Sequence, residues 1–299
     1  MAEFMTIIDA HSHLWLKQDT VVEGKRILSL KNGRSIFFDE EVQMIPPFII
    51  DGRNSAEVFL SNMDYAQVHG AVVVQEIIDG NQNEYLTHVQ QTWPDRFCCM
   101  GMAMTLDEAK AVKAMGLKGV ALPAHRLGAT SLLSLMPLFR YLQQEDMLLS
   151  ICLADDEHQI GEMREVLQES PSLRVAIGHF GMVTTPSFRQ QVLLCRESKN
   201  AMVESGGITW LFHKEFYPYP SAIRAIREAA DLVGMERLMW GSDYPRTITA
   251  ITYRMSYDFI LRSAELNQDE KEMFLGRNAV AFYGFKNLPE LPYIKNMSE

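Results

Sequence analysis

The chain has 299 residues, of which 47% are hydrophobic and 22% are charged. This balance is typical of a globular protein with a large buried core. The formal net charge of −10 argues against nucleic acid and anionic membranes as partners, because both carry negative charge themselves. The longest apolar runs have the length of strands, so we expect no transmembrane helix.

Two further features predict the compartment. The first residues lack a basic segment followed by an apolar one, so we expect no signal peptide, and Met5 is a candidate natural start with residues 1–4 as an addition before it. No pair of cysteines has the spacing of a metal site. We therefore expect four buried free thiols in a reducing cytoplasm, at Cys98, Cys99, Cys152 and Cys195.

A short apolar strand opens the chain and ends in His11-Ser12-His13. Side chains two residues apart in a strand point to the same face. His11 and His13 are therefore expected to project together from the carboxyl end of this strand. They could hold one metal ion or one substrate oxygen.

An irregular stretch over residues 15–54 follows the two histidines. Within it, two β-like runs at 26–30 and 35–38 flank an Asn32-Gly33 pair, which predicts a hairpin with a type I′ turn. A loop of this length in a compact domain usually serves function. Because it starts directly after the histidines, we place it over the site as a lid.

From Ser55 onward, strands and helices alternate. The strands are continuously apolar, which is typical of a parallel sheet covered on both faces. Strands are expected at 71–75, 97–103, 118–122, 148–153, 174–179, 201–204 and 237–240. Helices are expected at 55–69, 82–93, from a Thr105-x-x-Glu108 capping box onward, and at 131–145, 157–169, 187–197, 221–233, 247–265 and 269–283.

With the opening strand, these elements make eight βα units, the size of a TIM (β/α)8 barrel. No linker divides the chain, so we expect one domain over residues 1–299. An open doubly wound sheet is the alternative, but the turn after the first strand lacks a Gly-x-Gly-x-x-Gly motif. In a barrel, site residues come from the carboxyl ends of several strands. His179 follows the sixth strand and Asp243 the eighth, so both are expected beside His11 and His13.

Four segments together resemble the amidohydrolase superfamily, in the branch called amidohydrolase-2. They are Asp-Ala-His-Ser-His-Leu-Trp at 9–15, Gly-His-Phe-Gly at 178–181, Trp-Gly-Ser-Asp-Tyr-Pro at 240–245 and Gly-Arg-Asn-Ala at 276–279. The resemblance spans nearly the whole chain. It implies a barrel hydrolase or lyase with His11, His13 and Asp243 as site residues and His179 as a metal ligand or catalytic group.

The chain departs from that family at its fifth strand, where many members carry a further histidine. Here the strand end reads Cys152-Leu153-Ala154-Asp155, and His158 comes several residues late, in the first turn of the next helix. Asp155 is a candidate substitute. A binuclear metal centre is not expected, and the departure is similar to that of the lactonases of this branch, some of which use one metal and some none.

Other candidates lie near expected strand ends. Arg126 and His125 follow the fourth strand and Arg246 follows Asp243. An arginine there can bind a substrate carboxylate with two hydrogen bonds, and each of the three has a surface or packing role as its alternative. Glu76 and Glu204, at the ends of the second and seventh strands, are weaker candidates for substrate contact.

We therefore expect a cytoplasmic hydrolase of a small ester or lactone, derived from a sugar acid or an aromatic degradation product. Asp243 would activate water, while the three histidines, with one divalent metal (Zn²⁺ or Mn²⁺) or none, polarise the carbonyl. One alternative is a metal-dependent decarboxylase of the same superfamily, and the second is a non-catalytic binding barrel. The expected partner is a small molecule, and a homo-oligomer is left open.

Overall fold

The computed structural model describes residues 5–297. The interpretation of residues 1–4 as an addition falls outside the described residues. Within the described range, none of the helices has both the length and the apolar character that crossing a membrane requires.

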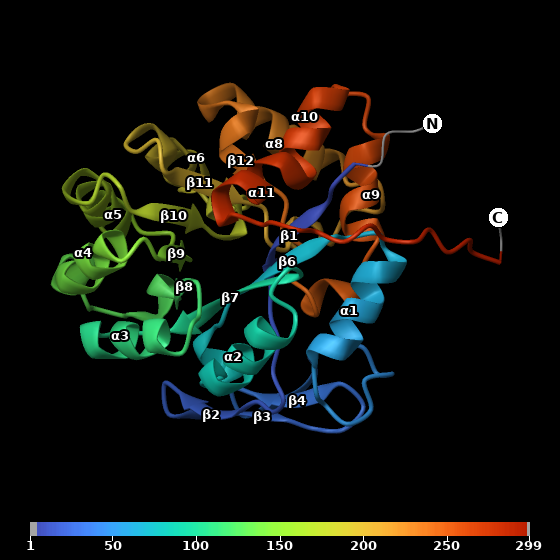
Figure 1. The fold of residues 1–299 in the computed structure, drawn as a ribbon, viewed down its shortest axis with the longest axis horizontal. Helices are drawn as coiled ribbons and strands as arrows, with labels where there is room; N and C mark the ends of the chain where they lie inside the picture. The colour runs from blue at the N-terminus through green and yellow to red at the C-terminus, as the bar shows by residue number, and fades with distance from the viewer. Residues whose placement is uncertain (1–4, 298–299) are drawn as a thin grey trace.

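Eight parallel strands form the centre of the molecule, in the order β1-β6-β7-β8-β9-β10-β11-β12 (Figure 1). Backbone hydrogen bonds join the last strand segment to the first: Ala10 N–H donates to the oxygen of Trp240, and Asp243 N–H donates to the oxygen of His11, both at 2.9 Å. The predicted (β/α)8 barrel is confirmed. Its strands are β1 (Ile8–Ser12), β6 (Gly70–Val73), β7 (Phe97–Met102), β8 (Gly119–Leu122), β9 (Leu148–Ile151), β10 (Arg174–Ile177), β11 (Ala201–Glu204) and β12 (Leu238–Met239).

Helices surround the barrel, and most lie where the apolar periodicity predicts them. The Thr105 hydroxyl accepts from the backbone N–H of Glu108, as expected for a capping box. The helices are α1 (Ala56–Tyr65), α2 (Asn83–Thr92), α3 (Leu106–Ala114), α4 (Met136–Gln144), α5 (Glu157–Glu169), α6 (Phe188–Leu193), α7 (Ile208–Leu211), α8 (Pro220–Val233), α9 (Met255–Arg262), α10 (Gln268–Glu272) and α11 (Asn278–Tyr283).

The continuous helix expected over 247–265 is wrong. The chain forms a 3₁₀ turn at Arg246–Thr249, and α9 begins only at Met255. Threonine hydroxyls explain the break, because that of Thr247 donates to the oxygen of Ser242 and that of Thr249 to the oxygen of Arg246. Such local bonds compete with the helical ladder.

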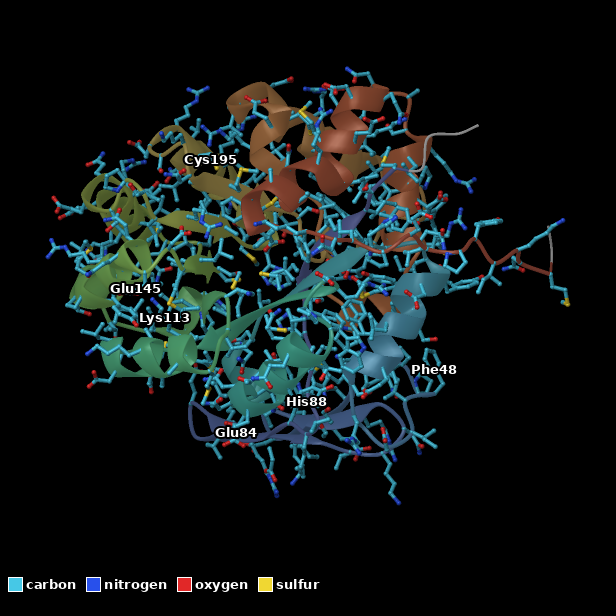
Figure 2. The ribbon with its side chains drawn as sticks, in the orientation of Figure 1. Phe48, Glu84, His88, Lys113, Glu145 and Cys195 are labelled. Carbon is cyan, nitrogen blue, oxygen red and sulfur yellow. The ribbon has the colours of Figure 1, made fainter. Side chains whose placement is uncertain are left out.

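The core has two layers, because successive strand residues point to opposite faces. One layer fills the barrel interior with residues such as Val72, Met100 and Leu148, and Tyr283 of α11 covers one end of it. The other layer lies between strands and helices. Surface pairs join neighbouring helices: Lys113 of α3 pairs with Glu145, which follows α4 (Figure 2).

The segment between β1 and α1 folds into a four-stranded antiparallel sheet in the order β2-β3-β4-β5. The predicted hairpin is present as β3 (Lys25–Ser29) and β4 (Arg34–Phe37), with positive φ at Asn32 and Gly33 as a type I′ turn requires. Two strands were not predicted, β2 (Asp19–Val22) and β5 (Glu40–Gln43). In Figure 1 this sheet lies at the bottom of the view.

A register shift in β1 directs the two histidines into the barrel mouth. Asp9 is paired with Ala71 of β6, but Ser12 is paired with Val73, so one residue of β1 is extra between these points. Such a bulge moves the following side chains to the other face. Ile8 and Ala10 belong to the interior cluster. After the shift, His11 and His13 take the inward positions.

Asp9 links β1 to the loop after β12. Its fully buried carboxylate accepts from the backbone N–H groups of His11 and Ser242 through Oδ1, and its Oδ2 contacts the hydroxyls of Ser242 (2.5 Å) and Tyr253 (2.7 Å). Burial raises the pKa of Asp9 to about 6, although the hydrogen bonds from Ser242, Tyr253 and His11 oppose this rise. Two backbone N–H groups and two hydroxyls thus bind the carboxylate of Asp9, and these four contacts lie where the barrel closes.

We predict that Asp9→Ala lowers the free energy of unfolding by about 3 kcal/mol, because it strips two buried N–H groups of their acceptor. Asp9→Asn is the matched variant. Its amide oxygen still accepts from both N–H groups, and its NH₂ group can donate to the two hydroxyls, so we expect a loss below about 1.5 kcal/mol. Urea unfolding measures both values. Equal losses for the two variants would contradict this role of Asp9.

Candidate active site

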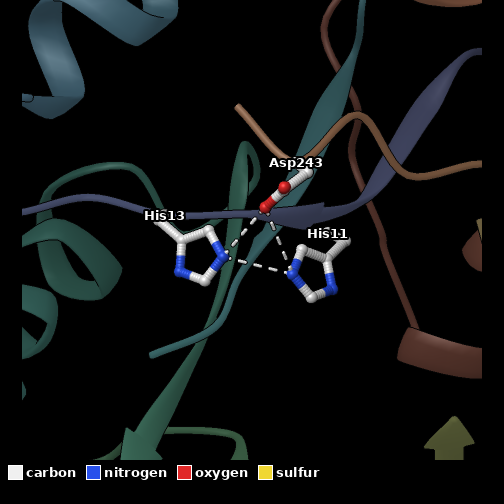
Figure 3. A group of neighbouring side chains, drawn as sticks. All are labelled: His11, His13 and Asp243. Atoms are coloured by element: carbon white, nitrogen blue, oxygen red, sulfur yellow. Dashed lines mark hydrogen bonds and ion pairs between the residues drawn. The ribbon is translucent and has the colours of Figure 1, made fainter. Parts of the chain in front are cut away.

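His11, His13 and Asp243 converge at the carboxyl ends of β1 and β12 (Figure 3). The two Nε2 atoms of the histidines are 3.2 Å apart. Oδ1 of Asp243 lies 3.2 Å from Nε2 of His13 and 3.7 Å from Nε2 of His11. The three side chains therefore direct one potential metal-ligand atom each toward a common point.

A buried carboxylate stands behind each of the two histidines. Nδ1 of His11 is 2.7 Å from Oε1 of Glu204, and Nδ1 of His13 is 3.0 Å from Oδ2 of Asp79. Glu204 is fully buried and Asp79 is 2% exposed. A carboxylate at Nδ1 favours the tautomer whose proton is on Nδ1, so both Nε2 lone pairs face the common point.

Sequence reasoning missed these two supporting roles. The end of the seventh strand predicts substrate contact for Glu204, but its oxygens accept from His11 and from the backbone N–H of Gly206. No pattern in the sequence points to Asp79. It belongs to a 3₁₀ turn at Ile77–Asp79 after β6, and its carboxylate also caps that turn at the N–H of Glu76. The position of Glu204 at a strand end was the only available signal.

Asp243 is held in a left-handed backbone conformation with φ of 58°, which aspartate tolerates better than most residues. Its Oδ2 accepts a hydrogen bond of 2.5 Å from Nε1 of Trp210. Burial opposes ionisation of this carboxyl, but the hydrogen bond from His13 and the charges of His179, His13 and His11 outweigh burial and hold the pKa of Asp243 well below its ordinary value. Asp243 is thus a carboxylate at neutral pH.

The donor set fits a divalent cation. Two imidazole lone pairs and one carboxylate oxygen repel one another at these distances unless positive charge lies between them. A proton supplies that charge in one state: burial lowers the pKa of His13, but Asp79 and Asp243 outweigh burial and raise it well above its ordinary value. A divalent metal ion would supply it in a metal-bound state, and nitrogen and oxygen ligands whose imidazoles contact buried carboxylates suit Zn²⁺ and Mn²⁺.

His179 follows β10 and lies beside this group without joining its compact core. Its ring centroid is 4.7 Å from that of His11, and its Nδ1 is 2.9 Å from the oxygen of Gly206. The contact with Gly206 occupies Nδ1, so Nε2 is the nitrogen left for a metal or a substrate. His179 lines the cavity described next.

The cluster opens into a cavity of about 610 Å³. Phe37 and residues 42–45 of the segment inserted between β1 and α1 line one side of it, which confirms the expectation that this segment covers the site. The other lining residues come from the barrel mouth, among them His13, Asp79, His179 and Asp243. Substrate entering this cavity would lie between the sheet and the histidines.

The three basic residues expected to contact substrate all line the cavity. Nε of Arg126 lies 2.8 and 2.9 Å from the two carboxylate oxygens of Glu76, and its guanidinium lies 5.5 Å from the ring centre of Phe38. Arg246 stacks 4.0 Å over the ring of Trp210. His125 is exposed, with Nδ1 3.4 Å from the oxygen of Cys152.

The four cysteines, Asp155 and His158 remain to be compared with the sequence predictions. Cys98, Cys99 and Cys195 are buried free thiols as expected, but Cys152 is half-buried, because it follows the last residue of β9 and lines the cavity. Asp155 is exposed at the cavity wall and accepts from the N–H of Ser187, outside the compact group of donors. His158 lies in the first turn of α5, as expected, and is exposed.

Comparisons with known proteins agree with this fold. The model of a family described as Amidohydrolase matches residues 8–285. No curated protein matches the chain.

Three solved structures illustrate the likeness. A probable 2-pyrone-4,6-dicarboxylic acid hydrolase from Acinetobacter baumannii, with citric acid bound, is 20% identical with a TM-score of 0.68 over 94% of this chain and 100% of that one. An amidohydrolase from Burkholderia multivorans with bound zinc is 16% identical, with a TM-score of 0.66 over 95% and 100%. The 5-carboxyvanillate decarboxylase from Novosphingobium aromaticivorans, complexed with manganese, is 17% identical, with a TM-score of 0.53 over 77% and 80%. At these identities the likeness shows the fold.

We predict that the chain binds one Zn²⁺ or Mn²⁺ and that Glu204→Gln weakens this binding about 10–100-fold, because the variant loses the charge behind His11. Competition with a chelator that changes colour on metal binding measures the affinity. Glu162→Gln is the control, since Glu162 is a buried carboxylate that bonds Ser131 and Leu132 outside the cavity. Equal affinities of wild type and Glu204→Gln would contradict the assigned role.

Proposed function

The chain belongs to the amidohydrolase family, and from the geometry of its site we propose that it hydrolyses a small lactone or ester that carries a carboxylate. One observation carries this proposal. Two members of the cluster of His11, His13 and Asp243, namely His13 and Asp243, line the same cavity as Arg246. The first group suits polarisation of a carbonyl and activation of water, and the second suits recognition of an anion.

In the proposed reaction, the oxygen of water attacks the carbonyl carbon while Asp243 accepts the proton of that water. The ring C–O bond then breaks, and the leaving oxygen takes the proton back from Asp243, so that a lactone and one water become a hydroxy acid. Nδ1–H of His179 donates to the oxygen of Gly206, so in the absence of a metal it is the imidazolium form of His179 that would donate from Nε2 to the developing oxyanion. The low pKa of Asp243 makes it a weak base. Proton transfer must therefore accompany the attack rather than precede it.

A divalent metal at His11, His13 and Asp243 would act as a Lewis acid at the carbonyl oxygen. With a metal bound, the neutral His179 would instead be a fourth ligand through the lone pair of Nε2, because this nitrogen has no partner among the described residues and the ring lies beside His11. Arg126, Arg246 and His125 are proposed to contact the substrate. Arg126 already shares its charge with Glu76, so Arg246 is the stronger candidate for the carboxylate.

The solved structure of the probable 2-pyrone-4,6-dicarboxylic acid hydrolase supports the choice of substrate class, because its name describes a lactone with two carboxylates and its fold covers nearly the whole of this chain. The alternative is decarboxylation of an aromatic acid, which the likeness to the manganese-bound decarboxylase supports. Hydrolysis of a lactone at full rate by this protein after removal of metal would exclude a metal-dependent decarboxylase as its function.

We predict that Asp243→Asn lowers kcat for hydrolysis of 2-pyrone-4,6-dicarboxylate, or of the best lactone in a panel, about 10²–10⁴-fold, because the amide cannot accept the proton of water. Loss of pyrone absorbance gives the rate. Asp107→Asn, an exposed carboxyl at the start of α3, is the control for the substitution itself. Full activity of Asp243→Asn would exclude Asp243 as the base.

A panel of lactones and aromatic carboxylates also separates the function classes. Release of CO₂ without lactone hydrolysis would favour the decarboxylase. Tight binding of a panel member without turnover by the wild type would favour the non-catalytic barrel.

A further inference from the structure

Trp210 contacts two charged groups of the cavity through two different parts of its indole ring. Its N–H edge donates to Oδ2 of Asp243 at 2.5 Å. Its face carries the guanidinium of Arg246 at 4.0 Å from the ring centre. All three side chains line the same cavity. One rigid ring thus touches both the proposed base and the proposed anion-binding group.

The edge contact determines which oxygen of Asp243 faces the histidines. Oδ2 is bound to the indole, so Oδ1 is the atom that lies near both Nε2 atoms. A carboxylate without this bond would be free to rotate about its Cβ–Cγ bond and present either oxygen. Hydrogen bonds to a charged acceptor are among the stronger ones in proteins.

The face contact sets the position of Arg246. Within residues 5–297 no carboxylate forms an ion pair with this guanidinium, so its charge is available to a ligand. A cation over an indole face is attracted by the ring electrons. Stacking leaves the N–H groups at the rim of the guanidinium plane free to bind a carboxylate with two bonds.

The backbone around Trp210 leaves the indole little room to move. A Cβ atom on Gly207 would lie 1.9 Å from Nε1 of Trp210, so the ring packs directly on the glycine backbone. Gly207 has φ of 72°, a conformation that glycine adopts without strain. The ring of His179 lies edge-on to the indole, with the two ring centroids 6.3 Å apart.

We propose that Trp210 is a positioning residue that sets the distance between the carboxylate of the substrate and the carbonyl under attack. It does so by holding Asp243 with its edge and Arg246 with its face. The proposal rests on the function proposed above and deepens it. It defines the substrate class as lactones in which the carboxylate and the reacting carbonyl have one fixed separation.

The two contacts can be separated by substitution. Trp210→Phe keeps an aromatic face but has no N–H, so we expect kcat for the carboxylated lactone to fall about 10–100-fold while KM changes less than about threefold. Arg246→Met removes the guanidinium, and we expect KM to rise about 10–100-fold with a smaller change in kcat. Trp210→Leu removes edge and face, so both constants should change. If Trp210 served only packing, its substitution would lower stability and would not change kcat and KM selectively in this way.

Direct binding tests the face contact without turnover. Isophthalate is an unreactive planar dicarboxylate, and calorimetry gives its Kd. We expect Trp210→Phe to bind it within about threefold of wild type, and Arg246→Met and Trp210→Leu to bind it at least tenfold more weakly. Trp93→Phe is the control for loss of an indole, because Trp93 is half-buried after α2 and does not line the cavity.

The outcomes distinguish the two proposals. If the wild type hydrolyses the lactone, the proposed function stands. In that case an unchanged kcat in Trp210→Phe, or equal changes in kcat and KM, would overturn the role of Trp210. Absence of lactone hydrolysis by the wild type would overturn the function. The isophthalate series would then decide the face contact, and a crystal structure of Trp210→Phe would decide the edge contact: a rotated Asp243 carboxylate supports it, and an unmoved one overturns it.

Discussion

Electrostatic repulsion among three acceptor atoms is the constraint on which the site depends. The Nε2 atoms of His11 and His13 and Oδ1 of Asp243 lie within 3.7 Å of one another. Such an arrangement is stable only with a cation or a proton between the atoms. The surrounding structure holds the atoms in place against this repulsion: Glu204 and Asp79 bind the far sides of the two imidazoles, and Trp210 binds the far oxygen of Asp243.

The fold and the central residues could be predicted from the sequence because both follow from simple periodicities. Eight apolar strands alternating with helices define a barrel, and the carboxyl ends of its strands meet at one mouth. His11, His13 and Asp243 therefore come together as expected. The bulge in β1 could not be predicted, because a one-residue slip leaves no mark in the pattern of a short, fully buried strand. The prediction that side chains two residues apart share a face is correct for His11 and His13, but the shift puts them out of step with the face alternation of Ile8 and Ala10.

The supporting residues were harder to predict, for a different reason. Glu204 and Asp79 act through what they touch, and a carboxylate at a strand end has the same sequence signature whether it faces substrate or a histidine. Trp210 comes from a short helix that follows glycines, where aromatic residues more often serve packing. Only the directions of the side chains, which require the full fold, distinguish these roles.

The segment between β1 and α1 has a small hydrophobic cluster of its own outside the strands of its sheet, formed by Trp15, Ile45 and Ile49 with Met44 packed against it. This cluster is separate from the two layers that stabilise the barrel. The walls of the cavity are therefore built by two parts with separate hydrophobic clusters, and His11, His13 and Asp243 belong to only one of them. Changes at Phe37 and residues 42–45 can reshape the volume above the histidines without altering β1 or β12. Selection for a new substrate, in nature or in the laboratory, would act on the shape of the cavity through Phe37 and residues 42–45, which line it.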